Sequence, residues 1–153
     1  MQTNKSTPAK SDQIDQLNSF LRGELSAVET YEMALDKIDK ASKARAQLER
    51  AKASHQERID VLTSAIRTQG GEPAAGSGPW GVFAKAVEGA AGIFGEKAAI
   101  AALEEGEDHG LKDYRADVAK LGPAARKLVE SEILPKQEQS HRTLSDLKKQ
   151  LAS

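Results

Sequence analysis

The 153-residue chain contains no cysteine, and this absence excludes several classes of protein at once. Disulfide scaffolds, thiolate zinc sites, iron–sulfur clusters and cysteine nucleophiles all require that side chain. Aromatic residues are also scarce, at 4% of the chain. A chain without cysteine is compatible with a reducing compartment, and we predict a cytoplasmic protein.

Long apolar runs and clustered positive charge are missing as well. No stretch approaches the ~20 apolar residues of a membrane-spanning helix, so we predict no transmembrane segment. Charged residues make up 29% of the chain with a net charge of −1, and basic residues alternate with acidic ones. Nucleic-acid-binding proteins carry a basic patch instead, so we expect no nucleic-acid partner.

The residues that are abundant favour helix. Ala, Leu, Glu, Lys, Gln and Arg dominate the sequence, and apolar residues recur at the spacing of one helix face. Residues 1–11 are polar and carry no apolar core of a signal peptide, so we predict a disordered tail there and one domain over residues 12–153. The predicted helices cover about 12–40, 43–68, 80–94, 96–120 and 123–151.

Several local signals set the ends of these helices. Ser11 or Asp12 is the predicted N-cap of the first helix, and Gln69-Gly70-Gly71 is a C-terminal stop signal for the second. Pro123 suits the first position of the last helix. Pro135, inside that helix, removes one backbone hydrogen bond and is expected to kink it just before Glu138.

The connection lengths predict how the long helices pair. Short connections near residues 41 and 121 make two antiparallel helical hairpins. About 25 residues, including the short helix 80–94, lie between them and are long enough to travel the length of a bundle. The expected fold is therefore all-α, a four-helix bundle of two hairpins joined by a long crossover, as in ferritin-like proteins.

A short phrase occurs twice in the chain. Residues 23–31 read GELSAVETY and residues 106–114 read GEDHGLKDY, so Gly-Glu-x6-Tyr recurs after 83 positions (107 − 24). Each copy is followed by a histidine, first in Lys52-x-x-His55 and then in Glu138-x-x-His141. Carboxylates and histidines that face one another across helices are the usual ligands of a metal in a bundle core.

The repeat therefore predicts a metal site. Oxygen and imidazole ligands without thiolate suit iron, manganese or zinc. The predicted ligands are Glu24, His55, Glu107, Glu138 and His141. Four further residues are expected beside the site, with the tyrosine hydroxyls orienting carboxylates and Glu104 as a fallback ligand: Tyr31, Tyr114, Lys52 and Glu104.

At these residues the chain resembles the ferritin-like di-iron carboxylate proteins. ELSAVETY is similar to their first-helix phrase, and EQSH is similar to the Glu-x-x-His of their fourth helix. RGELSAVETY, the Gly-Gly-Glu-Pro turn, GPWGVFAKAVEGAA and EEGEDHGLKDY together resemble a bacterial family of uncharacterised four-helix-bundle proteins (DUF2383-like). The resemblance implies the ferritin-like fold over nearly the whole chain after residue 12, but it implies no established activity.

One position departs from the ferritin-like pattern, which has Glu-x-x-His on the second helix too. Lys52 stands where that glutamate belongs, so we expect one iron or manganese ion rather than a symmetric pair, or no metal at all. Two functions follow: a metal-binding protein with a role in oxidative or general stress, or a non-catalytic structural or interaction protein with a metal-free polar core. No enzyme is claimed.

The segment from Trp80 to Phe94 carries an apolar helical face with interspersed glycines. This face either packs inside the molecule or forms a dimerisation patch, since small residues permit close helix contact. We predict a homo-oligomer, with a dimer favoured.

Overall fold

The computed structural model describes residues 7–78 and 81–152, apart from the side chains of Val82, Phe83, Val87, Ala90, Ala91 and Ile93. Every regular element within these residues is helical, so the all-α prediction is confirmed. The elements are α1 (Lys10–Lys37), α2 (Arg45–Thr68), α3 (Gly81–Phe94), α4 (Glu96–Asp117), a 3₁₀ turn (Val118–Lys120), α5 (Pro123–Leu128), a π-helical segment (Val129–Ile133) and α6 (Leu134–Ala152).

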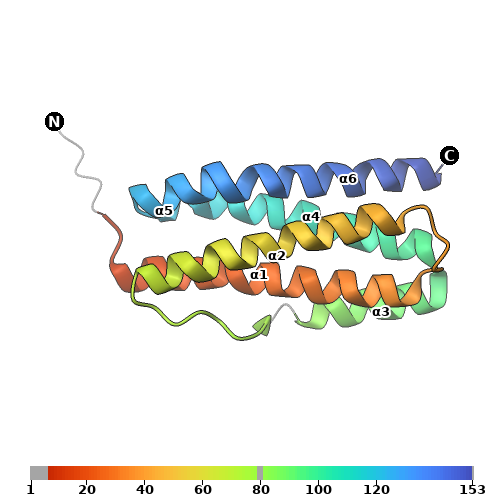
Figure 1. The fold of residues 1–153 in the computed structure, drawn as a ribbon, viewed down its shortest axis with the longest axis horizontal. Coiled ribbons are helices and arrows are strands. Elements are labelled where there is room, and N and C mark those ends of the chain that lie inside the picture. The colour runs from red at the N-terminus through yellow and green to blue at the C-terminus, as the bar shows by residue number, and fades with distance from the viewer. Residues whose placement is uncertain (1–6, 79–80, 153) are drawn as a thin grey trace.

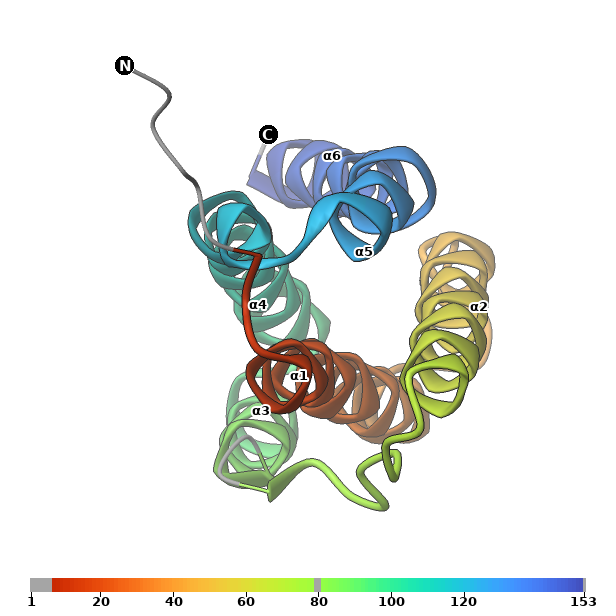
Figure 2. The same cartoon turned by 90° about the vertical axis from the view of Figure 1, so that its left-hand side faces the viewer.

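The long helices lie side by side along one axis (Figure 1). Helix α1 packs against α2, to which a short connection joins it, and α4 packs against α6. Viewed along the axis, α1, α2, α4 and the α5–α6 segment surround a common interior (Figure 2). Helix α3 lies outside this group, against α1 and α4.

The interior is two apolar clusters with polar side chains between them. One cluster contains Leu35, Leu48, Ile100 and Leu144, and the other contains Leu17, Leu62, Ile66, Val129 and Ile133. On α1, α2, α4 and α6, buried polar residues lie between the positions that enter the two clusters. The middle of the core is therefore a polar layer.

The predicted ends of the first two helices had different outcomes. Helix α1 begins at Lys10, and its N-cap, Ala9, makes no side-chain hydrogen bond, so the prediction that Ser11 or Asp12 caps it is wrong. Both residues lie within the first turn. Residues 1–6 of the predicted tail lie outside the described residues. The stop signal of α2 is confirmed, because Gly70 has φ +80° and the Gly71 amide donates to the Ile66 carbonyl at 2.9 Å.

Proline shapes the last helical stretch. Pro123 begins α5, as predicted. The irregularity near Pro135 is a π-helical segment over Val129–Ile133, upstream of the proline rather than just before Glu138. Pro135 has no N–H to give to the carbonyl four residues earlier, and a wider turn there accommodates that loss. Buried residues consequently recur every four positions through this stretch: Ala125, Val129, Ile133 and Gln137.

No helix within the described residues is both long and apolar enough to cross a bilayer.

Candidate functional site

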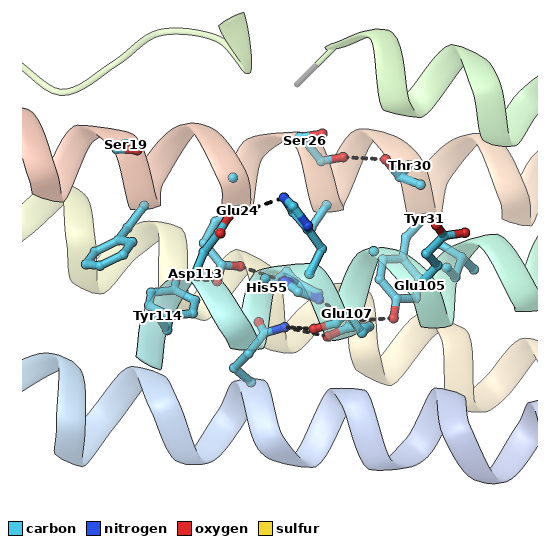
Figure 3. Close-up of a pocket in the computed structure, with 18 of the residues that line it drawn as sticks. Ser19, Glu24, Ser26, Thr30, Tyr31, His55, Glu105, Glu107, Asp113 and Tyr114 are labelled. Atoms are coloured by element: carbon cyan, nitrogen blue, oxygen red, sulfur yellow. Dashed lines mark hydrogen bonds and ion pairs between the residues drawn. The ribbon is translucent and has the colours of Figure 1, made fainter. Parts of the chain in front are cut away.

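The polar layer is centred on His55 of α2. Its Nδ1 lies 2.6 Å from Glu24 Oε2 on α1, and its Nε2 lies 2.6 Å from Glu107 Oε1 on α4. All three residues are only 3% exposed. His55 thus links the two glutamates of the repeated phrase across the interior (Figure 3).

The two tyrosines of the repeat donate to the opposite glutamates. Tyr31 of α1 donates its hydroxyl hydrogen to Glu107 Oε1 at 2.7 Å. Tyr114 of α4 donates to Glu24 Oε1 at 2.6 Å. Each copy of Gly-Glu-x6-Tyr therefore supplies a carboxylate to the layer and a hydroxyl to the carboxylate of the other copy.

Arg58 joins the layer one turn after His55 on α2. Its side chain is fully buried, with Nη1 3.4 Å from Glu24 Oε1. Its guanidinium also donates to Gln137 Oε1 and to Ser140 Oγ of α6. Arg58 therefore connects α2 both to α1 and to α6.

Gln137 and Ser140 complete the surroundings of Glu107. Gln137 Nε2 donates to Glu107 Oε2 at 2.9 Å, and Ser140 Oγ donates to the same oxygen at 2.7 Å. Gln137 Nε2 also lies 2.9 Å from the Glu107 backbone carbonyl. Every carboxylate oxygen of Glu24 and Glu107 therefore has at least one partner inside the layer.

The charges of the layer balance. A neutral imidazole donates from only one nitrogen, so with both glutamates ionised the two contacts at 2.6 Å require the protonated ring. Burial alone lowers the pKa of His55, but Glu107 and Glu24 outweigh it and raise that pKa above 6.5. With His55 and Arg58 positive, the two cations match the two glutamates.

The pKa values of the other titratable groups of the layer shift in the directions that keep the glutamates ionised and the tyrosines protonated. Burial raises the pKa of Glu107, but His55 and Arg58 act against it and lower that pKa to about 2. For Glu24, burial is likewise outweighed by Arg58 and His55, and the pKa is lowered. Burial and the adjacent carboxylates raise the pKa of Tyr31 and Tyr114 well above 10.0, so both remain hydroxyl donors.

Four residues of the predicted site lie outside this layer. Glu138 is 41% exposed and lies 3.6 Å from Arg115 Nη2. His141 Nε2 is 3.5 Å from Glu104 Oε1, in a separate, partly exposed group that also includes Asp108. Lys52 lies 3.6 Å from Glu32. The structure thus brings together Glu24, His55, Glu107 and the two tyrosines, and it separates them from Glu138, His141, Glu104 and Lys52.

Three members of the layer were missed from the sequence, although its periodicity carried a signal for them. On α6, steps of three and four back from Leu147 and Leu144 lead to Ser140 and Gln137, one position before His141 and Glu138. On α2, the same steps from Ala51 and His55 lead to Arg58 and then Leu62. The apolar pattern predicts buried positions at three polar residues: Arg58, Gln137 and Ser140.

These residues do not fit a metal ion in the observed arrangement. A histidine ligand coordinates through a nitrogen lone pair, whereas both ring nitrogens of His55 face carboxylate oxygens. Arg58, a permanent cation, lies beside Glu24. Among the described residues, no group of three or more His, Asp or Glu side chains has an arrangement that could hold a metal.

A cavity of about 320 Å³ lies between α1 and α4, against one side of the polar layer. It extends from Glu24, His55 and Glu107 to Glu105 and Asp113 at the surface (Figure 3).

A family model described as a domain of unknown function (DUF2383) matches residues 12–120, from the first turn of α1 to the end of the 3₁₀ turn. No curated protein and no solved structure matches the chain.

Proposed function

We propose that this chain, which belongs to the family described as a domain of unknown function (DUF2383), is a non-catalytic structural or interaction protein whose polar core works without a metal. The observation that carries the proposal is the position of His55, with each ring nitrogen 2.6 Å from a different glutamate. Hydrogen-bonded cations occupy the place where a metal ion would neutralise the carboxylates.

The proposal includes a ferritin-like four-helix bundle of two hairpins. The packing of α1 on α2 and of α4 on α6 supports it, as does the position of α3 on the long connection between these pairs. In this fold the polar layer specifies register, because a slide of either hairpin by one turn would leave buried charges without partners. Buried ionic groups contribute less to stability than to such specificity in several proteins.

The alternative is an iron or manganese site with a role in oxidative or general stress, formed by Glu24, His55, Glu107, Glu138 and His141. One observation favours it: the first three of these residues do meet in the core. To bring in the last two, α6 would have to rotate by one residue and expel Gln137 and Ser140 from the layer.

Metal content and stability together separate the two functions. The protein is purified without chelator and without nickel affinity, and its iron, manganese and zinc are measured per chain. Its free energy of unfolding is then compared with and without EDTA, and after titration with Fe(II) or Mn(II). We expect no stoichiometric metal and no change in stability. Stoichiometric metal whose removal destabilises the protein would overturn the proposal.

The partner that we propose for the interaction role is a second copy of the chain, through α3. Phe94 at the end of α3 is 72% exposed, whereas most other apolar side chains of the predicted patch, and Trp80, lie outside the described residues. Analytical ultracentrifugation of the wild type and of Phe94→Glu tests this surface. A dimer that the substitution weakens is expected, and a monomeric wild type contradicts it.

A further inference from the structure

We propose that the cavity between α1 and α4 binds an organic ammonium ion with an apolar body. The cavity adds a binding activity to the structural role above and does not depend on it.

Small residues line the cavity on both helices. On α1, a Cβ atom added to Gly23 would meet no atom of the described residues within 4 Å, so the absent side chain leaves open space among them. Ala27 on α1 and Gly106 on α4 also line the cavity. Gly110 of α4 also lines the cavity, but a Cβ added there would lie 3.0 Å from Gln137 Nε2, so the open space lies beside Gly23.

The walls suit an apolar group. Phe20, Leu103 and the two tyrosines of the repeat line the cavity with hydrocarbon and aromatic surface. A volume of about 320 Å³ lies at the small end of ligand pockets, so one ring with a short alkyl chain is a suitable size. Aromatic faces also attract cations that lie over them.

The charge around the cavity selects a cation. Among the described residues, its lining includes two histidines, His55 and His109, neither lysine nor arginine, and five carboxylates: Glu24, Glu105, Glu107, Asp113 and Asp117. Glu24 and Glu107 are occupied by the polar layer, which leaves the three carboxylates nearer the surface. Of these, Asp113 lies 3.6 Å from His109, and Asp117 pairs with Lys120 from outside the lining. A ligand whose ammonium group lies at the opening is attracted by these carboxylates, while its apolar body occupies the interior of the cavity. An anion is repelled.

The test uses 4-phenylbutylamine as the probe. Its two matched analogues are 4-phenylbutan-1-ol, which is neutral, and 4-phenylbutyrate, which is negative. Amide chemical shifts of Gly23, Gly106 and Gly110 are followed by NMR during titration of the full chain. We expect saturable shifts with the amine and a Kd on the order of 1 mM, typical of a fragment-sized ligand. The alcohol is expected to bind about fivefold more weakly, and the carboxylate more weakly still.

Two kinds of variant locate the site. Gly23→Leu places a side chain in the open space and is expected to abolish binding. Gly89→Leu on α3 is the matched control, since a Cβ there likewise meets no described atom within 4 Å, and binding should persist. Asp113→Asn and Asp117→Asn should each weaken binding of the amine about two- to fivefold and leave binding of the alcohol unchanged. Circular dichroism checks that each variant is folded.

Three results would overturn the proposal. One is the absence of saturable shifts at amine concentrations well above the expected Kd. Another is equal binding of the amine, the alcohol and the carboxylate, which would remove the charge preference. The third is undiminished binding by folded Gly23→Leu, which would place the site elsewhere.

Discussion

Tyr31 of α1 donates a 2.7 Å hydrogen bond to Glu107 of α4, and the repeat-matched Tyr114 returns a 2.6 Å bond to Glu24. The doubled phrase in the sequence is thus a crossed pair of contacts in the structure. Each glutamate is held by the tyrosine of the other copy, so both contacts join α1 to α4. His55 lies between the two glutamates and completes the connection.

The tyrosine hydroxyls are predicted to stabilise the fold by similar amounts. Tyr31→Phe and Tyr114→Phe each remove one buried hydrogen bond to a charged acceptor, which costs about 1.5–3 kcal/mol of unfolding free energy. Urea denaturation measures both. Thr68→Val is the control. The Thr68 hydroxyl donates to the Ser64 carbonyl at an exposed position, so its loss should lower the free energy of unfolding by less than about 0.5 kcal/mol. A tyrosine variant no less stable than this control would contradict the crossed contacts.

Arg58 is predicted to be the most sensitive residue of the layer. Arg58→Met leaves Glu24, Gln137 and Ser140 without their cationic partner, and breaking a buried pair in this way costs about 3–5 kcal/mol. Thermal or urea unfolding measures the loss. The matched control is Arg126→Met, whose pair with Glu130 is exposed on both sides and contributes at most about 1 kcal/mol. Equal effects of the two substitutions would show that Arg58 is not buried among these groups.

The register of α6 predicts that substitutions at neighbouring residues lower the free energy of unfolding by different amounts. Gln137→Ala and Ser140→Ala each remove a donor to Glu107 and should cost about 1–3 kcal/mol of unfolding free energy. Glu138→Ala should change it by less than about 1 kcal/mol, because that side chain is 41% exposed. The four-residue spacing through the π-helical segment would be wrong if Glu138→Ala were the more damaging change.

Stability is predicted to peak at mildly acidic pH. The folded pKa of Glu107 is about 2 against an ordinary 4.5, so its contribution is complete above pH 4.5 and is lost as the pH falls toward 2. That contribution is about 3 kcal/mol. His55 has a raised pKa, so its contribution is complete below pH 6.5 and is lost as the pH rises through the folded value.

Urea denaturation across pH 2–9 measures this profile. A maximum between about pH 4.5 and 6.5 is expected. Glu107→Gln should reduce the decline on the acid side, since the amide does not titrate, and the lowered pKa of Glu24 accounts for part of what remains. A wild-type stability that is unchanged from pH 5 to pH 3 would contradict the ionised layer.

Much of the fold could be predicted from the sequence because its signals are local. Helical spacing of apolar residues predicted the long helices, and the glycine pair at 70–71 and Pro123 marked two of their ends correctly. The N-cap prediction for α1 was wrong because the two suitable side chains, Ser11 and Asp12, lie inside the helix. Nothing in the local sequence showed that the helix begins before them.

The site could be predicted only in its repeated half. Glu24, Glu107 and His55 were found from spacing, and they do meet. Glu138 and His141 were selected from their three-residue spacing and from the match of His141 to His55, whereas the buried stripe that ends in Leu144 and Leu147 places Gln137 and Ser140 inward. The balance of charge through Arg58 could not be predicted from residue type, because arginine is rarely fully buried; only its position on the stripe of α2 indicated burial.

The protonation state of His55 tests the central claim most directly. In metal-free protein at pH 6.5, the ordinary pKa of histidine, NMR correlation of the ring nitrogens with their carbon-bound protons reports whether one or both nitrogens carry hydrogen. The account predicts two protonated nitrogens, one donating to Glu24 and the other to Glu107. A neutral ring with one bare nitrogen would contradict the charge-balanced layer and would restore His55 as a candidate metal ligand.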